Sequence, residues 1–195
     1  FNTGNGSALI GSFIGSGLFG ASAFADISEI LVFNRALQND ERQQVEGYLA
    51  WKWGLVQNLP TTHPYYYAKA PQTSFQPTSF PSCALWLDAA DRNTISSRVS
   101  QWTDKSSAGL NITQATAANQ PSYSNTNALT FVSASNRRLQ RTSLTSINTN
   151  SFTIFITFNI STTTLTFGRL FSLQTTNDNV NDTTGLNINT GTGAN

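Results

Sequence analysis

The sequence predicts an all-β fold, a sandwich of two sheets that carries one short amphipathic helix. Three observations predict it. Apolar runs of strand length recur along the chain between turns rich in Gly, Asn, Ser and Thr. Residues 39–54 alone have the three- and four-residue apolar spacing of a helix. Hydrophobic residues make up 38% of the 195 residues, which is enough to bury a core.

The first strands are predicted in residues 1–34. Residues 1–25 contain short apolar pairs separated by glycines, a pattern typical of tight turns between short strands. The next run, residues 26–34, alternates in a way that places Ile27, Leu31 and Phe33 near one face. Ile30 and Val32 then lie on the other face, as in a strand buried on both sides.

The helix is predicted from its ends as well as from its stripe. Gln38 or Asn39 can cap it, acidic residues follow in the first turn, where the helix dipole favours them, and Gly54 ends it. Its apolar stripe is expected to dock on a sheet and consists of Val45, Tyr48, Leu49 and Trp53. Trp51 lies off this stripe.

Residues 56–82 contain five prolines and are expected to form an extended linker, because proline blocks helix and ladder hydrogen bonds. Strands are predicted around Leu85, Trp102 and Ile112 and in residues 128–132 and 151–159. The residues after Leu173 are rich in Asn, Thr and Asp, and we expect no closing strand there.

The charge of the chain predicts no nucleic-acid partner, and the length of its apolar runs predicts no membrane span. Charged residues are 11% of the chain, less than half the usual fraction of about 25%, and the formal net charge is +1. Arg137 and Arg138 form the only basic pair, so we expect no nucleic-acid partner, which would need clustered cations. No apolar run approaches the roughly 20 residues of a membrane span. The chain begins at Phe1 and contains no Met, so we expect a fragment, a processed product or the visible part of something longer.

Residues 25–37 (ADISEILVFNRAL) and 41–54 (ERQQVEGYLAWKWG) form the most distinctive stretch of the sequence. They resemble the closing strand and helix of laminin-G-like modules, which have a concanavalin-A-like jelly roll and occur in surface proteins of bacteria and of large DNA viruses. Residues 84–91 (ALWLDAAD) and 99–106 (VSQWTDKS) resemble the opening strands of such a module, and residues 128–131 and 151–158 its later ones. The resemblance therefore implies a jelly-roll sandwich.

The closing elements precede the opening ones, which leaves two domain organisations open. In the first, the chain is a window on a tandem array: residues 1–55 end one module, 56–82 are a Pro-rich linker, and 83–195 begin a second module. In the second, residues 83–195 and 1–55 are the early and late parts of one circularly permuted module.

Catalysis is not expected. Glucanases of this fold carry Glu, Asp and Glu on one strand face, with the first as the nucleophile and the last as the acid. Asp26 and Glu29 match the last two acidic positions of that motif, but Phe24 replaces the first, the nucleophile. Asp26 is therefore expected to be a turn residue, and Glu29 a polar residue at a strand edge. His63, the single histidine, is expected in a turn, and Cys83, the single cysteine, as a small buried apolar residue.

Two kinds of binding site are candidates. The resemblance implies that calcium can be bound, and Asp88, Asp91 and Asp104 flank the opening strands, with Asp178 and Asp182 in a later loop. The first two can equally form Asx-turns, and Asp104 can close the turn of residues 102–106. An aromatic glycan platform could use Trp51, Tyr66 or Trp102, each of which could instead be packed in the interior.

We therefore expect a non-catalytic surface module with a structural or adhesive role, on a virion surface or in an extracellular protein. Its partners would be capsid or surface proteins or neighbouring modules of the same chain. The alternative is a carbohydrate-binding lectin module, with calcium as an aid. Four Asn-x-Ser/Thr sites agree with an exterior location, at Asn5, Asn111, Asn159 and Asn181.

Overall fold

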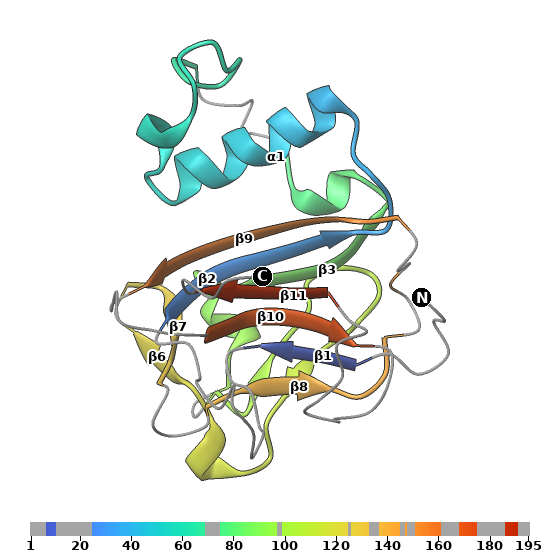
Figure 1. Ribbon diagram of the computed structural model, residues 1–195, viewed down its shortest axis with the longest axis vertical. Helices are drawn as coiled ribbons and strands as arrows, with labels where there is room; N and C mark the ends of the chain where they lie inside the picture. The colour runs from blue at the N-terminus through green and yellow to red at the C-terminus, as the bar shows by residue number, and fades with distance from the viewer. Residues whose placement is uncertain are drawn as a thin grey trace.

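The computed structural model describes residues 7–10, 25–68, 75–96, 99–124, 126–132, 137–144, 147, 151–160, 168–174 and 186–190. Within these ranges the chain forms two antiparallel sheets and one α-helix (Figure 1), which confirms the predicted all-β class with a single helix. Across the same ranges, no helix is both long enough and apolar enough to cross a bilayer.

Sheet A has six strands, and all of its paired neighbours run antiparallel. Their order across the sheet is β11 (Leu186–Thr190), β10 (Gly168–Gln174), β1 (Ser7–Ile10), β8 (Leu139–Arg141), β5 (Ile112–Thr113) and β4 (Gln101–Trp102). β11 contradicts the expectation that no strand follows Leu173. Its apolar residues Leu186 and Ile188 alternate with asparagines. This strand pattern has only two apolar positions, too few to stand out in an Asn/Thr-rich segment.

Sheet B is built around β2 (Ala25–Phe33). One side of β2 pairs first with β7 (Ala128–Phe131), which also pairs with β6 (Ser122–Ser124), and then with β3 (Cys83–Asp88). The other side pairs along its whole length with β9 (Thr153–Ile160). The strands predicted around Leu85, Trp102 and Ile112 and in residues 128–132 and 151–159 are thus present as β3, β4, β5, β7 and β9.

The main core lies between the two sheets. Its fully buried large side chains come from both layers and are Ile10, Ile27, Ile30, Leu85, Leu87, Trp102, Ile112, Leu129, Phe131, Leu139 and Phe171. Burying a large apolar side chain contributes about 1.5–3 kcal/mol, so this layer is the chief source of stability of the sandwich.

A β-bulge divides β2 into two halves. Ile27 pairs with Phe158 of β9 and Glu29 with Thr157, so Ser28 is an extra residue. Ile27 consequently shares the core-facing row with Ile30 and Val32, whereas Leu31 lies in a separate cluster beneath the helix. The predicted face was therefore wrong for Ile27, because strict alternation ignores the bulge, and agrees with the structure for the other four residues.

The helix α1 (Asn39–Lys52) lies over sheet B (Figure 1). Its ends agree with the prediction: Gln38 is the N-cap, its backbone amide donates to Oε2 of Glu41 at 2.9 Å, and Gly54 has a φ of +71° just after the helix. The stripe forms part of a second core cluster between the helix and sheet B. This cluster consists of Leu31, Phe33, Val45, Tyr48, Leu49, Cys83 and Trp86.

The expected linker is folded where the structure describes it. Short 3-10 helices occur at Val56–Asn58 and Pro77–Ser79, as they do later at Arg92–Thr94 and Ala117–Asn119. Tyr65 packs so closely on Gly47 that a Cβ added there would lie 2.6 Å from its ring, and Phe75 and Phe80 pack on the second core cluster. Residues 56–68 and 75–82 are therefore held against α1 and sheet B, because their aromatic side chains outweigh the extending effect of the prolines.

Strands from both predicted segments enter the same sheets. β1 pairs with β8 and β10, and β2 pairs with β3, β7 and β9. The division into residues 1–55, 56–82 and 83–195 as module boundaries stays a prediction. Most of the glycine-punctuated region, residues 1–6 and 11–24, lies outside the described residues.

Candidate functional site

The most unusual group of polar side chains lies between α1 and sheet B, and it begins with Glu29. The bulge at Ser28 turns Glu29 toward the helix, opposite Thr157 of β9 and Asp88 of β3. Glu29 is 0% exposed. The expectation of a polar residue at a strand edge was therefore wrong, because β2 has neighbours on both sides and α1 covers its outer face.

Both carboxylate oxygens of Glu29 are bound by donors of the protein itself. Oε1 accepts hydrogen bonds from the Tyr48 hydroxyl at 2.9 Å and the Trp86 indole at 2.8 Å. Oε2 accepts from the Trp53 indole at 2.7 Å and lies 2.8 Å from Nζ of Lys52. Three of these donors come from the helix or its C-cap, so one buried carboxylate ties α1 to the sheet.

The ion pairs continue from Glu29 toward the surface. Nζ of Lys52 also lies 2.8 Å from Oδ1 of Asp88, and Nζ of Lys105 lies 3.0 Å from both Oδ2 of Asp88 and Oδ2 of Asp91. The Lys105 ammonium is 4.2 Å from the centroid of a Trp86 ring. Carboxylates and ammonium groups thus alternate along this network, which we call the buried ion network: Glu29, Lys52, Asp88, Lys105 and Asp91.

The electrostatics follow from the depth of each group. Burial raises the pKa of Glu29 above its usual value of 4.5, and the nearby Lys52 opposes that rise. Burial and then the charge of Glu29 raise the pKa of Tyr48, so its hydroxyl stays a donor. At the outer end, hydrogen bonding to Lys105 lowers the pKa of Asp91. The charged form of the carboxyl group is therefore disfavoured at the buried end of the network and favoured at its outer end.

The three aspartates proposed for calcium do not share a site. The backbone amide of Ala90 donates to Oδ1 of Asp88, and that of Asn93 to Oδ1 of Asp91, as in Asx-turns. Among the described residues, no group of three or more His, Cys, Asp or Glu side chains could hold a metal ion. Asp178 and Asp182 lie outside the described residues.

Asp104 has a structural environment of its own. It is buried, and its Oδ1 accepts from the amides of Trp86 and Ser106 at 2.9 and 2.8 Å. Its Oδ2 accepts from the Ser106 hydroxyl at 2.7 Å and the Leu110 amide at 2.8 Å. This carboxylate closes the turn after β4 and fixes it to β3, as the alternative interpretation of Asp104 expects.

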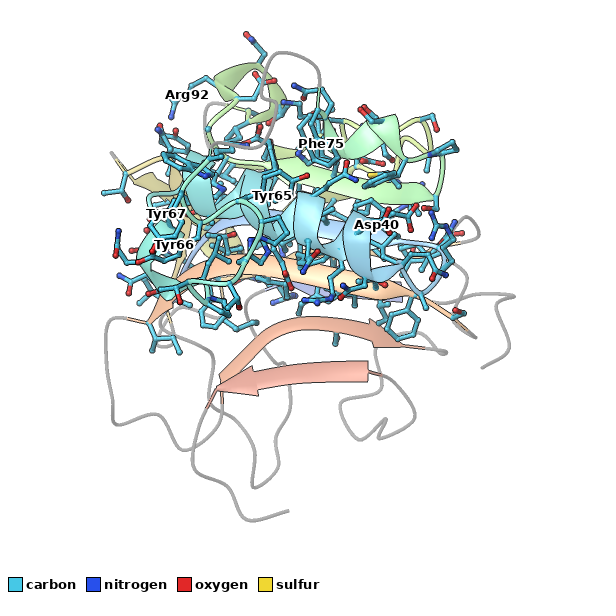
Figure 2. The ribbon with its side chains drawn as sticks, turned by 90° about the horizontal axis from the view of Figure 1, so that it is seen from above. Asp40, Tyr65, Tyr66, Tyr67, Phe75 and Arg92 are labelled. Carbon is cyan, nitrogen blue, oxygen red and sulfur yellow. The ribbon has the colours of Figure 1, made fainter. Side chains whose placement is uncertain are left out.

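The three candidate aromatic residues lie in different places. Trp102 is 0% exposed in the main core, so its ring is not part of a surface platform. Trp51 is half-buried, and its indole donates to the carbonyl of Tyr65 at 2.8 Å. Tyr66 packs edge-to-face on Tyr67 with ring centroids 4.7 Å apart, and Tyr67 is 81% exposed. Figure 2 shows this tyrosine pair near the end of α1 opposite Asp40.

The glucanase-like carboxylates share a face but not an accessible site. Asp26 lies within β2 and not in the expected turn, because it pairs with strands on both sides. The core-facing positions of Ala25 and Ile27 leave Asp26 on the outer face, where the Thr130 hydroxyl donates to it at 2.6 Å. The bulge keeps Glu29 on that same face, but α1 covers it completely. Phe24 lies outside the described residues.

His63 and Cys83 have packing roles. His63 is 8% exposed, and its Nδ1 accepts from the amide of Tyr65, so its Nε2 carries the proton shared with Glu46 at 3.2 Å. Cys83 is buried as expected, and burial raises the pKa of its thiol to about 12. Neither side chain has the exposed, activated setting of a nucleophile or general base.

Sequence reasoning missed the two lysines of the network. Lys52 ends the helix and Lys105 follows β4, and no local spacing relates either residue to Glu29 or Asp88. The one available signal is the rarity of charge: in a chain with 11% charged residues, a Glu inside an apolar strand needs a cationic partner. No family model, no curated protein and no solved structure matches this chain in the three comparisons made.

Proposed function

We propose that this chain is a non-catalytic module with a structural or adhesive role in a virion-surface or extracellular protein, and that its sheets form a laminin-G-like, concanavalin-A-like jelly roll. The observation that carries the proposal is that four of its acidic side chains are already bound by hydrogen-bond donors or ammonium groups of the protein itself. Glu29 and Asp104 use both carboxylate oxygens on donors of the protein, and Asp88 and Asp91 share Lys105.

Chemistry on a glycoside would need different carboxyl groups. A pair of them must reach the scissile bond from a cleft. Glu29 is 0% exposed and is held by two indoles, a phenol and an ammonium group, so it acts as an anchor for α1. An anchor of this kind stabilises one fixed arrangement of helix and sheet, which suits a module that presents a rigid surface.

The low charge of the chain supports an exterior role. A surface of Asn, Thr, Ser and Gln offers amides and hydroxyls that hydrogen-bond with little dependence on salt. The choice of a virion surface rests on the resemblance of residues 25–54 and 84–106 to modules of large DNA viruses. Other surface proteins, or neighbouring modules of the same chain, are the partners that this role implies.

The test is an assay for glycan hydrolysis on the folded chain with β-glucans as substrates. We expect no release of reducing ends. Hydrolysis that is lost in both Asp26→Asn and Glu29→Gln, and kept in Asp40→Asn at the exposed start of α1, would refute the proposal. Circular dichroism of each variant separates loss of a catalytic group from loss of the fold.

A second candidate function is carbohydrate binding at the tyrosine pair. Tyr67 is 81% exposed, and the Tyr66 hydroxyl donates to Oε1 of Gln57 at 3.2 Å, so an aromatic face lies beside an amide. Aromatic faces with adjacent amides suit the apolar face and hydroxyls of a sugar. Asp88, Asp91 and Asp104 are engaged with Lys105 and with backbone amides, so we expect any such binding to persist in chelator.

A glycan array, read with and without chelator, separates the two candidates. Binding that disappears in Tyr67→Ala but persists in Leu55→Ala, a matched exposed apolar residue, would favour the lectin. Absence of binding across the array would remove the lectin and leave the structural role.

A further inference from the structure

β9 is the outermost strand of sheet B within the described part of the chain. It pairs along its full length with β2 and with no other described strand. Since no described strand pairs with the second side of β9, the backbone groups on that side can hydrogen-bond to a strand of another chain. Figure 1 shows β9 beneath α1, alongside β2 and running in the opposite direction.

The usual protections of an edge strand are missing from β9. Thr153–Ile160 contains no charged residue and no proline. The bulge in this pair of strands lies on β2 at Ser28, so β9 itself is regular. An uncharged, regular edge strand of eight residues is a template for pairing with another chain.

The exposed side chains of β9 are apolar. Phe158 and Ile160 are 42% and 39% exposed, and they are two of the four large apolar side chains that are exposed among the described residues. Alternation puts them on the face of Ile154 and Ile156, which pack against the main core. This row therefore continues from covered residues to uncovered ones along a single strand.

We propose that β9 pairs antiparallel with β9 of a second copy of this chain, about a two-fold axis at Thr157. An axis perpendicular to the sheet keeps the core-facing row of both copies on one face, so residues of the same parity must lie opposite one another. Thr157 then faces Thr157 of the second copy. Phe158 faces Ile156 of the second copy, and Ile160 faces its Ile154.

The sequence of β9 is complementary to itself in this register. Each exposed apolar side chain lies opposite an apolar one, and the pair left over is Phe155 with Asn159. No like charges meet, because the strand has none. The shared surface is the same patch on both copies, as a closed dimer requires, and sheet B becomes continuous across the two chains. The inference deepens the proposed structural role and rests on it, since it names the partner as a second copy.

Sedimentation equilibrium of the chain over a range of concentrations is the first measurement, and we expect a monomer–dimer equilibrium. Phe158→Lys places an ammonium group in the shared row, so it should raise the dimer dissociation constant at least tenfold. The matched control is Leu55→Lys, which adds the same charge at another exposed apolar residue, 37% exposed, and should leave the constant unchanged.

The register is tested by cross-linking. Directly opposite residues of antiparallel strands have Cα atoms about 4.5–5.5 Å apart, within disulfide range. Thr157→Cys should therefore form a covalent dimer under mild oxidation, whereas Thr113→Cys, at an exposed threonine of β5 in sheet A, should not.

Three results would overturn the proposal: a monomer at every concentration, a dimer that Phe158→Lys leaves intact, or cross-linking that is equal for the two cysteine variants. Thermal unfolding of each variant shows whether it is folded. Failure here is distinct from failure of the proposed function, because hydrolysis of β-glucans that is lost in Asp26→Asn and Glu29→Gln and kept in Asp40→Asn would refute the latter whatever the state of association.

Discussion

Removal of the Lys52 ammonium group should destabilise the protein strongly. Lys52→Met keeps most of the side-chain length but leaves Glu29 without its cation, 2.8 Å away, and Asp88 with Lys105 alone. Breaking a buried ion pair costs about 3–5 kcal/mol, because a charge stays buried without compensation. Lys52 is one fifth exposed and Glu29 not at all, so we expect about 3 kcal/mol.

The measurement is equilibrium unfolding in urea followed by tryptophan fluorescence, since Trp53 and Trp86 both donate to Glu29. A matched control is Arg42→Met on the same helix. Arg42 pairs with Glu46 and is 44% exposed, so its loss should cost less than about 1 kcal/mol.

The double variant Glu29→Gln, Lys52→Met completes a cycle. Removing both charges should cost less than the sum of the two single changes, by about 2 kcal/mol, because neither charge is then left alone. A loss below about 1 kcal/mol for Lys52→Met, no larger than for Arg42→Met, would mean that water screens the pair, and the reasoning would be wrong.

Three further predictions follow from named contacts. Burial raises the folded-state pKa of Glu29 above 4.5, so its ionisation costs stability as pH rises from 4.5 through that raised pKa. Glu29→Gln should flatten this fall in urea titrations, and an unchanged slope would contradict it. Hydrogen bonding to Arg35 lowers the pKa of Glu41 to about 2. The stability that this ion pair contributes is therefore present above pH 4.5 and is lost as the pH falls toward 2. In Arg35→Ala, the pKa of Glu41 measured by NMR titration should return toward 4.5, and a pKa still near 2 would exclude Arg35 as the cause. Gly47→Ala should destabilise the protein by about 1–3 kcal/mol in thermal melts despite better helix propensity, because its Cβ would lie 2.6 Å from Tyr65; a more stable variant would show that Tyr65 moves aside easily.

The elements with strong local patterns could be predicted from the sequence. The helix was predicted with its ends because its cap, its first-turn acids and Gly54 are all local signals. β9 was predicted because one of its two rows is apolar throughout, and the other row contains Thr153 and Thr157. Pairing could not be predicted, since β2 binds strands that lie far along the chain, and local periodicity carries no information about partners.

The candidate site was predicted less well. Asp88, Asp91 and Asp104 were singled out as charged residues next to strands, but their partners are Lys105 and backbone amides, which only the fold brings near. Glu29 was placed at an edge because the sequence does not show that α1 covers β2. The sequence shows each charged residue of the network singly. It does not show the network, because the network depends on contacts between β2, β3, α1 and the turn after β4.

The extra residue Ser28 has a consequence for insertions and deletions. A one-residue deletion within a strand usually reverses every side chain beyond it. At Ser28 we expect the opposite, because Ile27 and Ile30 face the core on either side of the bulge, and with the extra residue removed plain alternation from Ile27 would also point Glu29 outward and Ile30 into the core. Deleting Ser28 would chiefly remove the hydrogen bond that the Ala89 amide donates to the Ser28 carbonyl, 2.9 Å long. Related chains shorter by one residue at this point could therefore keep both the core and the buried anchor of the helix.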